Sequence, residues 1–275
     1  MNNPIRTAFN LYLHASVHVA VAVFALVQMT FYFCRLPFDA PVSALAFSGT
    51  LFSYNFIKYA ETIYKGKRPW SSNIKAIAGL SMLALSVAAI SFFMLAPPAQ
   101  LVTLGLLLLC LLYAIPINPK IPNLRNWAGI KIYIVSFCWA GVTLIIPAVN
   151  AGLDLTPDIG IKFLQRFFLV LILILIFEIV DLQFDDKKLK TVPQTLGLLQ
   201  TKRLILLLLI PFFFLEFFKA GFQPIQAWNN TLIAALVLFF TWKASPKQTK
   251  YFTLFWVESV PIVWWLLVVG EKFFS

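Results

Sequence analysis

Long runs of apolar residues alternate with short polar segments along the whole chain. A helix needs roughly 20 mainly apolar residues to cross a hydrocarbon layer about 30 Å thick. Nine segments approach that length, at residues 8–32, 41–64, 74–96, 100–115, 130–148, 163–180, 204–218, 227–242 and 252–270. The pattern predicts an all-α fold, a polytopic membrane protein of about nine transmembrane helices in a single domain of residues 1–275.

Composition and charge agree with this prediction. Hydrophobic side chains make up 60% of the chain and charged ones 12%, against roughly 25% charged in soluble domains. The net charge of +11 would suit a nucleic-acid partner, but the distribution of Lys and Arg predicts a lipid bilayer instead, because they gather in alternate loops.

The distribution of positive charge also predicts the orientation. Lys58 lies within a span, and sixteen lysines and arginines fall on the side of the N-terminus. Five fall on the other side, namely Arg35, Lys162, Arg166, Lys219 and Lys272. Cytoplasmic loops carry an excess of Lys and Arg, so we expect a multi-pass protein with its N-terminus in the cytoplasm, in the inner membrane if the cell is bacterial.

Acidic residues gather where the sixth predicted span ends. Glu178, Asp181 and Asp185 sit at i, i+3 and i+7, which places them on one face of a continuing helix, and Asp186 flanks that face. Converging carboxylates repel each other unless a multivalent cation, a lysine or a proton neutralises them. The cluster is therefore a candidate metal site; alternatively, it marks where the helix leaves the bilayer.

Polar residues also share a face at the end of the second span. Asn55, Lys58 and Tyr59 follow the helical spacing, and the next loop, residues 65–70, is basic and contains Arg68. Lys58 either extends to the membrane interface or points inward at an anion. The basic loop either sets topology through lipid headgroups or captures phosphate.

Two further polar pairs are predicted inside the helices. His14 and His18 are one helical turn apart, which suits a metal or an acid, and a polar pair with Glu258 of the last span is the interpretation we favour. Glu216 and Lys219 at the outer end of the seventh span are spaced for an interfacial ion pair.

The motifs described so far resemble those of the UbiA-type prenyltransferase superfamily, whose members transfer an isoprenoid from its diphosphate to an acceptor. The second acidic motif of that family, with the threonine, proline and glycine after it, is matched by Glu178, Asp181, Asp185, Thr191, Pro193 and Gly197. The family's loop between spans four and five is similar to Tyr113, Pro116, Arg125, Asn126 and Gly129. The resemblance implies nine helices around a central cavity that opens near the cytoplasmic side.

The first acidic motif of the family is represented only by Asn55, since Phe56, Tyr59 and Ile63 stand where acids are usual. The resemblance implies that Glu178, Asp181 and Asp185 are catalytic and bind Mg²⁺. It also implies that a prenyl diphosphate is held by Asn55, Lys58, Arg68, Arg125 and Asn126.

Three functions follow from these expectations. The first is a divergent prenyltransferase that acts on a prenyl diphosphate and a lipophilic acceptor, with ionisation assisted by Mg²⁺ at the cytoplasmic side. The second is a non-catalytic relative that binds an isoprenoid or another lipid, or supports a partner protein. The third is a transporter, which the absence of an evident internal repeat disfavours.

Overall fold

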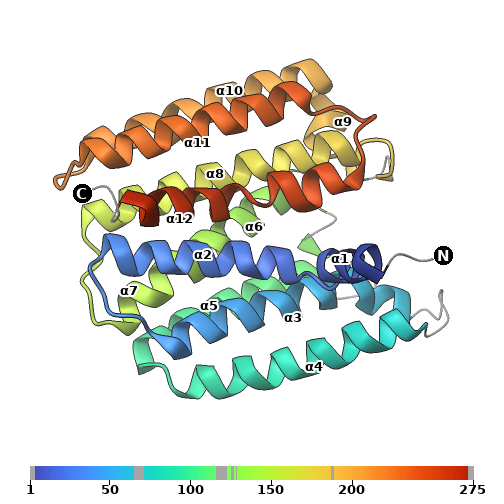
Figure 1. The fold of residues 1–275 in the computed structure, drawn as a ribbon, viewed down its shortest axis with the longest axis horizontal. Coiled ribbons are helices and arrows are strands. Elements are labelled where there is room, and N and C mark those ends of the chain that lie inside the picture. The colour runs from blue at the N-terminus through green and yellow to red at the C-terminus, as the bar shows by residue number, and fades with distance from the viewer. Residues whose placement is uncertain are drawn as a thin grey trace.

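The computed structural model describes residues 4–64, 71–115, 123–124, 127, 129–186 and 189–271, and this part of the chain consists of helices and connecting turns (Figure 1). The elements are α1 (Pro4–His14), α2 (Val17–Phe33), α3 (Ala40–Tyr64), α4 (Ser72–Phe93), α5 (Pro97–Ala114), α6 (Ile130–Ala140), the π-helix η2 (Gly141–Ile145), α7 (Ile146–Asn150), α8 (Pro157–Asp181), α9 (Val192–Leu196), α10 (Leu198–Phe214), the 3₁₀-helix η4 (Leu215–Phe218), α11 (Pro224–Lys243), the π-helix η5 (Phe252–Val257) and α12 (Val260–Glu271).

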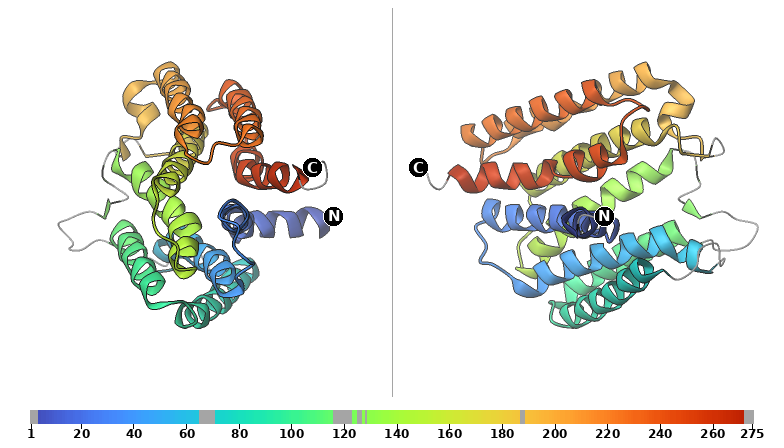
Figure 2. Two further views of the ribbon diagram at one scale, coloured as in Figure 1. Left: turned by 90° about the vertical axis from the view of Figure 1, so that its left-hand side faces the viewer. Right: turned by 45° about the vertical axis from the view of Figure 1, so that its right-hand side comes forward.

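The long helices lie side by side, and α8 is the most enclosed of them. Within its most apolar stretch 67% of the residues are buried, compared with 17% in α4 and 11% in α5. Figure 2 shows the helices nearly end-on in its left panel, with α4 and α5 at the periphery. Their exposed apolar side chains, such as Met82, Leu83, Leu101 and Leu108, form the kind of surface that faces lipid.

The predicted polytopic membrane fold is confirmed, but the count of nine spans is not. In the described residues seven helical segments are long and apolar enough to cross a membrane, and the bent pair α1–α2 brings the number to eight. Helix α3 has 25 residues and is long enough, but it is not among these segments. The two chain termini lie at opposite ends of the helices (Figure 1).

The first predicted span is broken rather than continuous. Helices α1 and α2 meet at an angle of 62°, and Ser16, between them, has the left-handed backbone angle φ of 58°. Just beyond the break, His18 donates from Nε2 to the Phe255 carbonyl at 3.0 Å and accepts from the Tyr12 hydroxyl at Nδ1 at 2.8 Å. The expected pairing between the first and last spans therefore forms, with this carbonyl and Ser259 rather than with Glu258.

The fifth predicted span contains a π-helical turn that places two elements close to each other. A Cβ atom at Gly141, the first residue of η2, would lie 2.9 Å from both terminal carbons of Leu106 on α5. The Thr143 carbonyl in η2 accepts two external hydrogen bonds at 2.6 Å, from the Thr30 hydroxyl and from Arg166 Nη1 of α8. The π-turn thus connects α2, α5 and α8 at one level of the bundle.

Candidate functional site

A pocket of about 220 Å³ lies beside the end of α8. Its polar lining comes from Tyr113 at the end of α5, Lys131 at the start of α6, and the acidic residues Glu178, Asp181 and Asp185. Its apolar lining consists of Ile132, Val135, Ile174, Phe177 and Leu189. The pocket is therefore amphiphilic, with charged groups at the helix end and hydrocarbon towards the middle of α6 and α8.

The backbone keeps the three acids on one side of the molecule. Helix α8 ends at Asp181, and the amides of Phe184 and Asp185 still donate to the Asp181 carbonyl, at 2.8 and 2.9 Å. This extra turn carries Asp185 round to the pocket, as the spacing in the sequence predicts. Because a helix has partial negative charge at its C-terminus, the carboxylates lie where the field already favours a cation.

Glu178 is already neutralised within the protein. Its side chain is 5% exposed, and Lys131 Nζ lies 2.8 Å from Oε1. The amide of Val192, at the start of α9, donates to Oε2 at 2.9 Å. A multivalent cation, a proton or a lysine could neutralise this acid, and here a lysine does so. Glu178 therefore fixes the ends of α6 and α9 against α8.

Asp181 and Asp185 are not engaged in this way. Both are partly exposed, and among the described residues neither carboxylate accepts a hydrogen bond or forms an ion pair. Lys250 and Lys131 both interact electrostatically with Asp181, and Lys250 Nζ lies 4.5 Å from the Phe184 ring centroid. These two acids are therefore the ones available to a ligand.

Two residues of this site were missed by the sequence analysis. Lys131 could have been found, because the fifth and sixth spans are consecutive and antiparallel, which brings the start of one beside the end of the other. Gln194 accepts from the Thr191 amide at 3.0 Å and donates to the Asp186 carbonyl at 3.2 Å. The Thr-x-x-Gln spacing before a helix is a signal for this contact.

The residues from the first acidic motif lie elsewhere and support the helix break. Asn55 is buried, and its Nδ2 donates to the Ala15 carbonyl and to Ser81 Oγ, both at 3.0 Å. The His14 carbonyl accepts from Lys58 Nζ at 3.2 Å and from the Tyr59 hydroxyl at 2.9 Å. Neither Asn55 nor Lys58 lines the 220 Å³ pocket. The predicted Arg68, Arg125 and Asn126 lie outside the described residues.

The donor set fits one magnesium ion that arrives with its ligand. Mg²⁺ is usually held by one or two carboxylates together with substrate phosphates and water, and Asp181 and Asp185 supply two. In the part of the chain that the structure describes, no group of three or more His, Cys, Asp or Glu residues could hold a metal. Glu178 Oε1 forms an ion pair with Lys131 but accepts no hydrogen bond among the described residues.

No protein-family model matches this sequence, and no curated protein matches it either. The fold has solved counterparts. A UbiA homologue from Aeropyrum pernix K1, solved in its apo state, superposes with a TM-score of 0.68 at 14% identity, over 93% of this chain and 98% of that one.

Two further solved structures are similar over nearly their whole length. One is described as giving insight into the biosynthesis of digeranylgeranylglyceryl phosphate synthase in membranes, with a TM-score of 0.57, 14% identity and 95% and 96% coverage. The other is a UbiA homologue from Archaeoglobus fulgidus bound to GPP and Mg²⁺, with a TM-score of 0.50, 12% identity and 94% and 95% coverage.

These findings define the class first: the chain is an integral, multi-pass helical membrane protein. Within that class it has the UbiA-type prenyltransferase fold.

Proposed function

We propose that this protein binds a prenyl diphosphate together with one magnesium ion in the pocket at the end of α8, and transfers the prenyl group to a lipophilic acceptor. The observation that carries the proposal is the pair of unengaged carboxylates, Asp181 and Asp185, at the polar end of an otherwise apolar pocket. The solved neighbour that contains GPP and Mg²⁺ has the same fold.

The charges in the pocket favour a diphosphate that carries its own cation. Glu178, Asp181 and Asp185 against Lys131 leave an excess of two negative charges among the described lining residues. A bare diphosphate would be repelled, whereas a bound magnesium ion would cancel two of its negative charges and would itself be attracted by the free carboxylates. When bound, magnesium would neutralise charge on the leaving diphosphate.

The chain's own residues would do the positioning. Lys131 supplies a fixed positive charge at the pocket and is held there by Glu178. Ile132, Val135, Ile174 and Phe177 offer a hydrocarbon wall for the start of the prenyl chain. Since drug-sized ligands occupy roughly 300–1,000 Å³, a pocket of about 220 Å³ suits the head of such a substrate, with the tail extending along the lipid-facing side.

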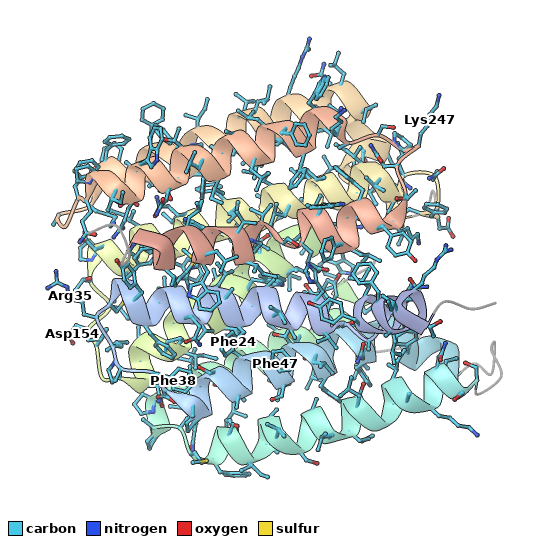
Figure 3. The ribbon with its side chains drawn as sticks, in the orientation of Figure 1. Phe24, Arg35, Phe38, Phe47, Asp154 and Lys247 are labelled. Atoms are coloured by element: carbon cyan, nitrogen blue, oxygen red, sulfur yellow. The ribbon has the colours of Figure 1, made fainter. Side chains whose placement is uncertain are left out.

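We further propose that this end of the molecule faces the cytoplasm. Figure 3 shows Lys247 at the same end as the N-terminus, and Arg35 and Asp154 at the opposite end. The excess of positive residues in the loops at the first end supports this orientation.

A second candidate function is favoured by the positions of Asn55 and Lys58. Both side chains donate to carbonyl groups at the α1–α2 break, and other residues replace the acids usual in this part of α3. On this view the protein would bind an isoprenoid or another lipid without catalysing its reaction. The two candidates differ in their need for metal.

The test is binding of a non-hydrolysable prenyl diphosphate analogue to the purified protein, with Mg²⁺ and with EDTA. We expect metal-dependent binding that weakens about tenfold or more in Asp181→Asn and in Asp185→Asn, because each removes one of two ligand charges. Asp154→Asn, an exposed acid at the opposite end, is the matched control and should bind as wild type. Metal-independent binding that is insensitive to both substitutions would favour the second candidate.

A further inference from the structure

A second cluster of charged groups lies at the other end of α8, far from the acidic pocket. Lys162 and Arg166 come from the first half of α8, Glu216 and Lys219 from the region of η4, and Gln226 from the start of α11. Glu216 is 1% exposed, Arg166 2% and Lys219 6%. The expected pair of Glu216 and Lys219 is thus confirmed, and both side chains are buried within the protein.

The single buried carboxylate of this cluster is fully occupied. Lys219 Nζ contacts Glu216 Oε1, and Gln165 Nε2 donates to Oε2 at 3.1 Å. Asn230 Nδ2 donates to the same oxygen at 3.4 Å. Glu216 therefore pairs with Lys219 through Oε1 and accepts from two side-chain amides at Oε2.

Among the described residues, the hydrogen-bond partners of those other two cations are neutral. Lys162 Nζ donates to Gln226 Oε1 at 3.1 Å and lies 3.6 Å from the Phe33 ring centroid. Arg166 Nη1 donates to the Thr143 carbonyl at 2.6 Å. The nearby Asp158 is partly exposed. It accepts from the Ala220 and Gly221 amides at 2.9 and 3.0 Å and interacts electrostatically with Lys162 and Lys219. Among the described residues, three cations thus face two carboxylates, the buried Glu216 and the partly exposed Asp158, which leaves an excess of one positive charge.

Arg166 also has a donor without an acceptor. Within the described part of the chain, its buried Nη2 has no hydrogen-bond partner. Arg166 lines a cavity of about 10 Å³, whose other lining residues are Phe33, Lys162, Gln165, Glu216, Gln226, Asn229, Asn230 and Trp264. A volume of that size holds about one water-sized particle. An uncompensated buried charge is costly, and a buried donor without a partner adds to that cost.

We propose that this cavity binds one monatomic monovalent anion of chloride size. Arg166 Nη2 and Lys162 Nζ, both on α8, would hold it beside Phe33 of α2 and Gln226 of α11. Water would satisfy the orphan donor but would leave the excess charge, whereas a chloride ion satisfies both. Phosphate and carboxylate ligands are too large for a cavity of about 10 Å³.

Thermal unfolding of the full chain in detergent tests the proposal, in sodium chloride, sodium bromide or sodium sulfate at equal ionic strength. Sulfate stabilises proteins in general by exclusion from their surface, so a nonspecific salt effect would favour sulfate. We expect the opposite order, with a midpoint about 5 °C higher in chloride or bromide and a saturating dependence on halide concentration.

Variants distinguish the cavity from other halide sites. Lys162→Gln removes one cation, and we expect it to weaken the halide dependence about tenfold; Arg166→Gln should abolish that dependence wherever it folds. Arg203→Gln, an exposed arginine whose Nη1 donates to Gln200, is the control and should retain it. Equal midpoints of wild type in chloride and sulfate, or full halide dependence in Lys162→Gln, would overturn the proposal.

Discussion

Lys131 and Glu178 form the ion pair that lines the acidic pocket in the described part of the chain. At 2.8 Å, its Coulomb attraction is about 6 kcal/mol for an effective dielectric constant of 20. Desolvation of both groups offsets much of this. In Lys131→Met, Glu178 keeps the Val192 amide but loses its counter-charge. We expect that to cost about 3 kcal/mol in the free energy of unfolding, since breaking one side of a buried pair leaves an uncompensated charge.

A double-mutant cycle measures the interaction directly, with Lys131→Met, Glu178→Gln and the double variant followed by reversible unfolding in mixed micelles. We expect the double variant to be less destabilised than the sum of the singles, by about 1.5 kcal/mol or more, because each single removes the same contact. Lys75→Met, an exposed lysine on α4, should change stability by at most about 0.5 kcal/mol. Additivity within about 0.5 kcal/mol would refute the reasoning.

Two further predictions concern the packing of the bundle. Asn55→Leu leaves the Ala15 carbonyl without its donor and should lower the free energy of unfolding by about 1–3 kcal/mol; loss of analogue binding at unchanged stability would instead place Asn55 in the diphosphate site. Gly141→Ala brings a methyl group against Leu106 at 2.9 Å and should cost about 1–2 kcal/mol. The double variant Gly141→Ala, Leu106→Val should recover most of the stability lost in Gly141→Ala. If the single and the double variant lost stability equally, the cause would not be steric.

The hydrophobic pattern predicted the helices well because membrane spans are defined by composition and length. The run of residues 163–180 became α8, one residue longer at its acidic end. The break between α1 and α2 was not predictable in this way. The expected span of residues 8–32 has neither proline nor glycine near residue 15. Donors from α3, on another part of the chain, satisfy the carbonyls that the break exposes.

The candidate site was predictable where helical spacing alone determines it. Glu178, Asp181 and Asp185 do reach one pocket, as their i, i+3 and i+7 positions require. What differs among them is not visible in the spacing: Glu178 is paired with Lys131, a residue 47 positions earlier in the sequence. Whether an acid is free to bind a ligand depends on such tertiary partners.

The polar contacts at the two ends of α8 also fix its alignment with the preceding span. Lys131 pairs with Glu178, and the Thr143 carbonyl pairs with Arg166; within each segment the two positions are 12 residues apart. In a pair of antiparallel helices, equal spacings on the two helices mean that both contacts form in the same register. At 1.5 Å per residue, the two contacts lie about 18 Å apart along the helices. The apolar faces of α6 and α8 fit each other in several registers, but a buried charge tolerates only the one that supplies its partner. The same two contacts leave Asp181 and Asp185 free at one end and Arg166 Nη2 free at the other.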